Sequence, residues 1–392
     1  MNYTLTYSLP YITVLLIFAI FSVIFAQRHE NKEDALLCTC ISTGAIILFY
    51  VFFAFRGYVY SDWLSYSEGF KNVEWEDIFN ITNEKSKAVI HEPGFTALMC
   101  FCSLFTREYA FLVFVITTID TILFIRFLKR WDVQNIPFAL MLFFTFEGVG
   151  LMFNALRNQL AIFIFLNALE YINQRKPIHY YAICFIALCF HSSAIFYFPL
   201  YFILGYKLNK WAFLILIFTF FAFYISQISI VLTIIKMLGV EGALGEKAEF
   251  YTEAFTTARA LSPTGTVEKL GLTILIFLYY GKLTKDKTNV ILINSLILCY
   301  FFYYVFGEFR ELSSRISLLF EYSYWVLCIR LTNIFAIQNN KRLFGGLFFL
   351  YCLYVTALAY RDPIQEYDNL LFGAKSQTER LKIYNKTVED EQ

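Results

Sequence analysis

Long apolar runs separated by short polar loops are the dominant pattern along this chain. A transmembrane helix needs about 20 mainly apolar residues, because the hydrocarbon core of a bilayer is about 30 Å thick. We therefore expect an all-α polytopic membrane protein, residues 1–392 forming a single transmembrane domain with about 12 helices (roughly 10 to 14). The runs are residues 9–26, 35–55, 108–126, 137–150, 155–172, 178–190, 193–206, 211–235, 270–281, 289–306, 313–330 and 343–359.

Composition strengthens this interpretation. The chain is 58% hydrophobic and 16% charged, against about 45–50% and 25% in soluble domains. Disorder, a coiled coil and a secreted disulfide scaffold are excluded, and the runs lack the alternation of a membrane barrel. The net charge of +1 gives no reason to expect a nucleic-acid partner.

Six short basic loops set the expected orientation, since cytoplasmic loops are enriched in Lys and Arg. The larger loops, 56–93 and 236–269, are then extracytoplasmic, as are both termini. The polar C-terminal tail, 360–392, carries five Lys or Arg residues, so one miscounted span would place it inside. The basic positions are Arg28/Lys32, Arg126/Lys129/Arg130, Arg175/Lys176, Lys207/Lys210, Lys282/Lys285/Lys287 and Arg330/Lys341/Arg342.

The apolar stretch 94–105 is too short to span a bilayer. It follows Glu92-Pro93-Gly94, and proline is favoured in the first turn of a helix. We expect a re-entrant or interfacial helix near 94–105 on the outer face.

Ionisable residues near the outer ends of the spans are the strongest functional signal, because charges at membrane depth are costly and need a reason. On the expected topology they all fall on the extracytoplasmic side. They are Arg56, Asp62, His91, Glu92, Glu147, Arg157, His191, Glu308, Arg310, Glu311 and Arg315.

Arg157 lies in a polar notch with Asn154, Asn158 and Gln159, where the run 155–172 begins. A snorkelling arginine at a helix end is the plain alternative. The notch, however, places too many donors on one helical turn for a surface that faces lipid.

His191 separates two apolar runs that are each too short to cross a bilayer. A hairpin would place its turn, with the following serines, in protein or a water-filled cavity below the outer surface. A satisfied core histidine is one alternative. One long tilted helix over 178–206 is another, and it would separate His191 from Arg310 and Arg315.

Two further groups of residues each have two open interpretations. Arg310 and Arg315 form an anion cradle, since arginine binds two phosphate oxygens together, or a solvated network with Glu308 and Glu311. Arg56 and Asp62 bracket an aromatic segment that runs to Tyr66 and is either an interfacial belt or a sugar-stacking surface.

Several chemistries have no signal in the chain. The motifs of P-loop, dinucleotide-binding, zinc-protease and serine-hydrolase sites are absent. Only four histidines are present, and the nine cysteines lie in apolar runs, where they serve as small buried side chains. We expect no metal and no cofactor.

The motifs at these positions resemble those of the EpsG-like branch of Wzy-type polysaccharide polymerases. The resemblance covers roughly residues 45–325, and one position departs from it, since Asn158 stands where glutamine is usual. The matching positions are Arg56, Asp62, Tyr66 and Phe70; Glu92-Pro93-Gly94-Phe95; Arg157 to Ala161; Phe190 to Ala194; and Arg315.

The resemblance implies a metal-independent glycosyltransferase of GT-C-like, multi-span style in the bacterial inner (cytoplasmic) membrane. It would join undecaprenyl-diphosphate-linked oligosaccharide repeat units into O-antigen or a related polysaccharide on the periplasmic face. Membrane lipid and a chain-length regulator are its other expected partners.

Residue roles follow as a hypothesis. Arg157 and Arg315, with Arg310 as a third candidate, bind the diphosphate, because preorganised cations stabilise a developing charge. His191 is the base or a diphosphate donor, with Asp62 and Glu92 as alternative bases. The remaining candidates for substrate contact are Arg56, Tyr66, Asn154, Asn158 and Gln159.

Four rival functions stay open: a lipid-linked oligosaccharide flippase or transporter, an O-antigen ligase, a membrane O-acyltransferase and a structural subunit. A transporter would place charges at the midplane and often show repeats, and neither pattern is visible in this chain.

Overall fold

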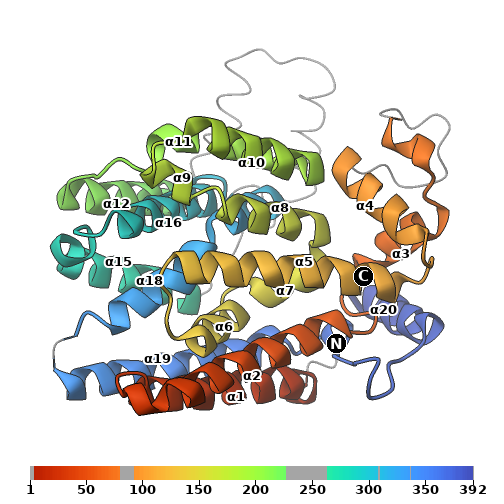
Figure 1. Ribbon diagram of the computed structural model, residues 1–392, viewed down its shortest axis with the longest axis horizontal. Helices are drawn as coiled ribbons and strands as arrows, with labels where there is room; N and C mark the ends of the chain where they lie inside the picture. The colour runs from red at the N-terminus through yellow and green to blue at the C-terminus, as the bar shows by residue number, and fades with distance from the viewer. Residues whose placement is uncertain (1–3, 80–91, 227–262, 308–309, 336, 392) are drawn as a thin grey trace. The chain divides into compact units, whose positions relative to one another are not determined.

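The computed structural model describes residues 4–79, 92–226, 263–307, 310–335 and 337–391, and within these ranges the regular structure is helical (Figure 1). Contacts divide the chain into two compact units. Unit 1 holds residues 1–199 and 337–392, and unit 2 holds residues 200–336. The expected all-helical class is confirmed.

Unit 1 is built from long antiparallel helices with shorter ones at one end (Figure 1). In chain order its elements are η1 (Leu5–Ser8), α1 (Leu9–Arg28), η2 (Lys32–Asp34), α2 (Ala35–Ala54), α3 (Trp63–Asn72), η3 (Trp75–Ile78), α4 (Pro93–Ser103), α5 (Tyr109–Arg130), α6 (Ile136–Thr145), α7 (Gly148–Asn154), α8 (Leu156–Leu166), α9 (Glu170–Asn173), α10 (Pro177–Phe190), η4 (Ser192–Tyr197), α19 (Gln338–Ala359), η6 (Pro363–Gln365) and α20 (Gln377–Glu391).

Unit 2 packs α12 against α15 and α16, and α16 against α17 and α18. Its elements are α11 (Leu200–Ile203), α12 (Lys210–Ser226), α15 (Pro263–Leu283), α16 (Lys287–Val305), α17 (Arg310–Ser317), η5 (Leu318–Phe320) and α18 (Tyr322–Thr332). Part of the predicted loop 236–269 is therefore helical, because α15 begins at Pro263; residues 227–262 lie outside the described ranges.

Within the described residues, five helices are long and apolar enough to cross a membrane, or six if α6 and α7, bent by 69°, form one span. This supports a helical membrane protein and does not reach the expected count of about twelve. Breaks divide several predicted spans. Run 137–150 is broken at Glu147, which has a left-handed φ of 54° between α6 and α7. Run 155–172 is divided between α8, which ends at Leu166, and α9, and run 193–206 is divided between η4 and α11.

The predicted hairpin at His191 is present. The hydroxyl of Tyr180 in α10 donates to the carbonyl of Tyr197 in η4 at 2.7 Å. In one continuous helix these residues would lie about 25 Å apart. The alternative of a single long helix over 178–206 is therefore wrong.

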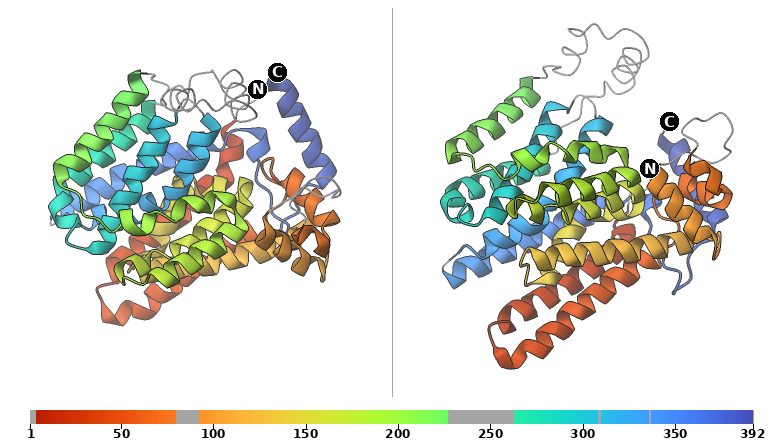
Figure 2. Two further views of the ribbon diagram at one scale, coloured as in Figure 1. Left: turned by 90° about the horizontal axis from the view of Figure 1, so that it is seen from above. Right: turned by 45° about the horizontal axis from the view of Figure 1, so that its top comes forward.

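The two ends of unit 1 differ in the segments they hold. At one end lie the α1–α2 and α5–α6 turns and the start of α10, which carry three of the predicted basic loops (Figure 1). At the other end lie α3, α4, α20 and both chain ends, as Figure 2 shows from two further directions. We call the first the basic end and the second the site end.

The C-terminal tail is docked at the site end. The N–H of Leu370 donates to the carbonyl of Phe55 at 2.7 Å, and the N–H of Gly57 donates to that of Asp368 at 3.1 Å. A Cβ on Gly57 would collide with the carboxylate of Asp368, so a larger residue at this position would displace that side chain. The tail thus contacts the start of the predicted loop 56–93, and the predicted topology places both on the same side.

Candidate functional site

Arg157 lies at the site end, on the first turn of α8. Its Nη1 is 2.5 Å from Oε2 of Glu92, and its Nε donates to the hydroxyl of Tyr66 at 3.3 Å. The guanidinium carbon also sits 5.8 Å from the centre of the Tyr66 ring. One arginine therefore joins α8 to α3 and to the residue that precedes α4.

The Glu92-Pro93-Gly94 segment explains how the carboxylate reaches this position. Pro93 starts α4, and a Cβ on Gly94 would lie 2.7 Å from the carbonyl oxygen of Cys189. Glycine therefore lets α4 pack directly on the end of α10. There, Oε1 of Glu92 accepts the N–H of Ser192 at 2.8 Å, so both carboxylate oxygens are held.

Glu92 is a poor candidate for a general base. Burial raises the pKa of its carboxyl, but the charge of Arg157 and the N–H of Ser192 outweigh burial and lower that pKa overall. Because a base works best with a pKa near the working pH, the geometry assigns Glu92 to holding Arg157 in place.

The His191 turn adds a chain of polar groups. Nδ1 of His191 lies 2.7 Å from Oγ of Ser193, and that hydroxyl donates to Oδ1 of Asn158 at 2.9 Å. Asn158 is the residue after Arg157. The turn is therefore anchored to the same helical turn that carries the arginine.

Asn154, the last residue of α7, holds the approach to α3. Its Oδ1 accepts the N–H of Asp62 at 2.9 Å, together with the N–H and hydroxyl of Ser61 at 3.3 and 3.2 Å. Asp62 precedes α3, on which Tyr66 sits one turn later. The amide thus positions both residues.

We call Asp62, Tyr66, Glu92, Asn154, Arg157, Asn158 and His191 the Arg157 cluster. It rests on a layer of buried apolar side chains from α3, α4 and α5, with the Tyr66 and Phe95 rings 5.7 Å apart. The side chain of Arg157 is 24% exposed, and among the described residues its Nη2 has no hydrogen-bond partner. A partly exposed cation with an unused donor is suited to an anionic ligand.

Two predicted candidates lie elsewhere. Gln159 is fully buried, and its amide donates to Oδ2 of Asp120 in α5 at 2.6 Å. Arg56 is 3% exposed, and its Nη1 donates to the carbonyl of Phe53 at 2.8 Å and to the Thr117 hydroxyl at 3.4 Å. Both face the interior of unit 1, away from the Arg157 cluster.

We call Arg56, Asp120 and Gln159 the buried brace. Burial lowers the pKa of the Arg56 guanidinium, and Tyr109 and the carboxylate of Asp120 act in the opposite direction. The brace connects the end of α2, the middle of α5 and the first turn of α8. Gln159, two residues after Arg157, thus has a structural role that needs no contact with substrate.

The two late arginines belong to unit 2. Arg310 begins α17, and its side chain lies outside the described residues; Arg315 is exposed on the same helix. Their predicted roles remain a hypothesis. His91 and Glu308 also lie outside the described residues.

Sequence reasoning noted Ser193 only as one of the serines after His191, and it missed Asp120. The contact of Ser193 with His191 could have been predicted, because a serine two residues from a histidine in a turn can hydrogen-bond to it. Asp120 could also have been identified, because it is a lone carboxylate inside an apolar run. Within the described residues no group of three or more metal-ligating side chains occurs, and none of the nine cysteines forms a disulfide.

Comparison with known proteins gives one match. Neither the curated proteins nor the solved structures gave a match to the chain. The model of the EpsG family matches residues 39–370, which include every residue of the Arg157 cluster and of the buried brace. Because this match covers most of the chain, the protein belongs to the EpsG family.

Proposed function

We propose that the protein is a metal-independent glycosyltransferase that polymerises undecaprenyl-diphosphate-linked repeat units into O-antigen or a related surface polysaccharide. The observation that carries this proposal is the Arg157 cluster, a partly exposed cation fixed by Glu92 and Tyr66 next to the His191 turn. Membership of the EpsG family, which is associated with membrane polysaccharide biosynthesis, supports it.

In this reaction the bond between the sugar C1 and the diphosphate oxygen of the donor breaks. A hydroxyl oxygen of the incoming unit bonds to C1, its proton goes to a base, and undecaprenyl diphosphate leaves with the electron pair. Arg157 would stabilise the charge that grows on this leaving group. Glu92 and Tyr66 hold the guanidinium before substrate arrives, so little reorganisation is needed.

His191 and Asp62 are the two candidate bases. His191 is held through Nδ1 by Ser193, and Asp62 is held through its N–H by Asn154. A histidine base would give a rate that rises with pH near 6.5, whereas an aspartate base would give a rise near 4. The pH dependence of kcat therefore separates them.

The proposed site faces the periplasm from the bacterial inner membrane. Three of the predicted cytoplasmic loops, Arg28/Lys32, Arg126/Lys129/Arg130 and Arg175/Lys176, lie at the end opposite the Arg157 cluster, as this orientation requires. The docked C-terminal tail also brings lysines and arginines to the site end. On this proposal the shorter helices α8, α10 and α12 add to the five or six long apolar spans in a multi-span, GT-C-like arrangement. A chain-length regulator is a further proposed partner.

The test is reconstitution of the purified protein in liposomes with a synthetic undecaprenyl-diphosphate repeat unit. A ladder of lengthened lipid-linked glycans, formed without a nucleotide sugar and in the presence of a chelator, would support the proposal. Movement of intact units across the bilayer without any lengthening would contradict it and favour a flippase. An Arg126→Ala variant, altered at an exposed residue of the basic end, is the matched control.

A further inference from the structure

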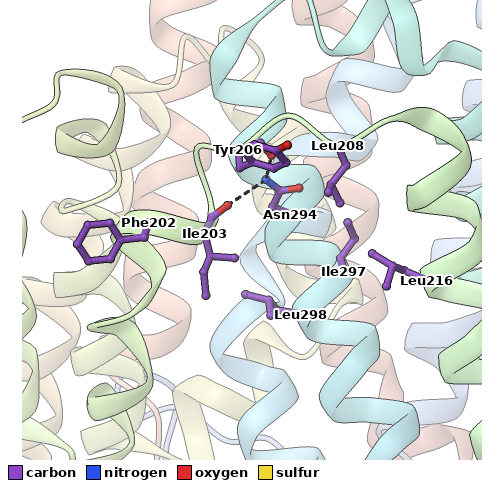
Figure 3. A pocket seen from close by; sticks show the side chains of 8 residues that line it. All are labelled: Phe202, Ile203, Tyr206, Leu208, Leu216, Asn294, Ile297 and Leu298. Atoms are coloured by element: carbon purple, nitrogen blue, oxygen red, sulfur yellow. Dashed lines mark hydrogen bonds between the residues drawn. The ribbon is translucent and has the colours of Figure 1, made fainter.

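Two cavities of the structure differ in the side chains that line them. The cavity of unit 2, of about 340 Å³, is lined by apolar and aromatic side chains and by the amide of Asn294 (Figure 3). The lining of a much smaller cavity in unit 1 includes Arg380 and Tyr384 of α20 together with Tyr60 and Trp63. Arg380 is 3% exposed, and burying a cation is costly unless it is paired. Its partners therefore show what this arginine holds in place.

Arg380 fastens α20 to the preceding part of the tail. Its Nη2 lies 2.8 Å from Oδ2 of Asp368 and donates to the carbonyl of Glu366 at 2.5 Å. The same Oδ2 of Asp368 accepts the N–H of Lys375 at 2.9 Å. Removing one partner of a buried ion pair is strongly destabilising, so Arg380 fixes the path of the tail between residues 366 and 380.

The tail in turn holds the segment between α2 and α3. The backbone carbonyl of Asp368 accepts the N–H of Gly57 at 3.1 Å, and that of Ile364 accepts the N–H of Tyr60 at 3.0 Å. The amide of Gln365 also donates to the Tyr60 hydroxyl at 3.3 Å. Both the backbone and the side chain of Tyr60 are therefore held by the tail.

Tyr60 has a backbone conformation that a tyrosine rarely adopts. Its φ is 67°, in the left-handed region, where the Cβ of an L-residue lies too close to a carbonyl oxygen. A bulky residue keeps such a conformation only when its surroundings hold it there. Nε1 of Trp63 donates to the Tyr60 carbonyl at 3.0 Å, and the tail supplies the two contacts described above. Without the tail, Tyr60 would relax toward a negative φ.

The backbone at Tyr60 sets the direction in which the chain enters the Arg157 cluster. Asp62 follows two residues later, and Tyr66 lies one turn further along α3. The hydroxyl of Tyr66 accepts the Nε of Arg157 at 3.3 Å. A change of φ at Tyr60 would therefore rotate Asp62 and Tyr66 relative to Arg157, which is carried by α8.

We propose that Arg380 is a positioning residue of the Arg157 cluster. It keeps the tail in the path that holds Tyr60 left-handed, and Tyr60 in turn sets the placement of Asp62 and Tyr66. The role rests on the function proposed above. It extends the site beyond residues 39–370, which the family model matches.

Hydrogen exchange followed by mass spectrometry tests this positioning without an activity assay. In Arg380→Gln, peptides covering residues 57–66 should exchange about tenfold faster, because their amides lose the tail as a partner, whereas peptides of α10 should be unchanged. Lys382→Gln, which removes one positive charge from an exposed position of α20, is the matched control and should behave as wild type. Wild-type exchange of residues 57–66 in Arg380→Gln would overturn the proposal.

A second variant serves if Arg380→Gln unfolds. Gln365→Ala leaves the buried ion pair of Arg380 intact and removes the donor to the Tyr60 hydroxyl. The same peptides should then exchange about threefold faster, as expected for the loss of one hydrogen bond. Unchanged exchange in this variant would break the link between the tail and Tyr60.

Kinetics in the liposome assay separate positioning from a merely structural role. In Arg380→Gln, kcat per folded protein should fall about tenfold or more, since a misplacement of about 1 Å can cost about 100-fold. The KM for the repeat unit should change by less than about threefold, because interactions made only in the transition state alter kcat and not ground-state binding. Arg380→Lys, which can keep the ion pair with Asp368, should recover most of the rate. Equal losses in Arg380→Lys and Arg380→Gln would contradict the assigned role.

The outcomes distinguish this role from the proposed function. A wild type that forms no ladder refutes the proposed function, and hydrogen exchange alone then decides whether Arg380 orders residues 57–66. An active wild type with an unchanged kcat in Arg380→Gln refutes only the role of Arg380.

Discussion

The Arg157 cluster and the buried brace are built from the same chemistry, yet their surroundings give them opposite roles. Each contains an arginine, a carboxylate and a side-chain amide, and each uses the first turn of α8. Arg157 is 24% exposed and retains an unused donor, whereas Arg56 is 3% exposed and Gln159 is fully buried. Burial, and not residue type, separates the side chains offered to a ligand from those that hold helices together.

Removing the carboxyl group of the buried brace should produce the largest effect, which is a loss of stability. Asp120→Leu leaves the buried Gln159 amide without the acceptor of its 2.6 Å hydrogen bond, which typically costs about 1–3 kcal/mol. It also removes the carboxyl group that favours the charged form of the buried Arg56. We expect a lower thermal midpoint in detergent and a lower yield. Asp120→Asn, which can still hydrogen-bond to Gln159, is the control for side-chain size. If Asp120→Leu unfolded at the thermal midpoint of wild type, the buried brace would not stabilise the protein, and this difference from the Arg157 cluster would be lost.

Removing the exposed cation should affect activity while leaving stability nearly unchanged. Arg157→Ala should lower the polymerisation rate by about 100- to 1,000-fold, as loss of one preorganised group at a developing charge does. Its partly exposed ion pair adds little to stability, so its thermal midpoint should lie close to that of wild type. Normal long chains at equal protein levels would contradict the role of Arg157.

The close contact between α4 and α10 offers an intermediate test. Gly94→Ala adds a Cβ that would lie 2.7 Å from the Cys189 carbonyl, so α4 must shift and carry Glu92 away from Ser192. We expect about 1–3 kcal/mol of destabilisation and a drop in polymer yield. Gly346→Ala in α19, where a Cβ would meet no atom within 4 Å, should leave both quantities unchanged.

The smallest expected effect is a pH dependence. Because the folded state lowers the pKa of Glu92, the stabilisation from its carboxylate is present above the unfolded value of about 4.3. It is lost as pH falls through the lower folded value. The thermal midpoint of wild type minus that of Glu92→Gln should therefore be constant at neutral pH and shrink below about pH 4. A difference that grows as the pH falls would contradict the lowered pKa of Glu92.

Much of the helical order could be predicted from apolar runs, whereas helix length could not. Run 35–55 became α2 almost unchanged, because no residue within it interrupts the helix. The run from 137 was instead broken by the left-handed backbone of Glu147, which no propensity rule indicates for glutamate. The helix α3 inside loop 56–93 was also missed, since its apolar face is short and mixed with polar residues.

The site was predicted in part for a related reason. Arg157, Glu92 and His191 were each identified as charges or turn residues near span ends, and the structure brings them together. Arg56 and Gln159 satisfied the same criterion and are buried. At a helix end, a shift of two residues turns a side chain from the open face to the core, and sequence position does not fix which face is open.

The most direct test of the central claim is the rate of undecaprenyl diphosphate release from a synthetic repeat unit. It should be measured in the same liposomes for wild type, Arg157→Ala, Arg126→Ala and Asp120→Asn, with each rate normalised to folded protein. We predict that only Arg157→Ala loses release, by about 100-fold or more, while the other two stay near the wild-type rate. Equal release by Arg157→Ala and wild type would contradict the account.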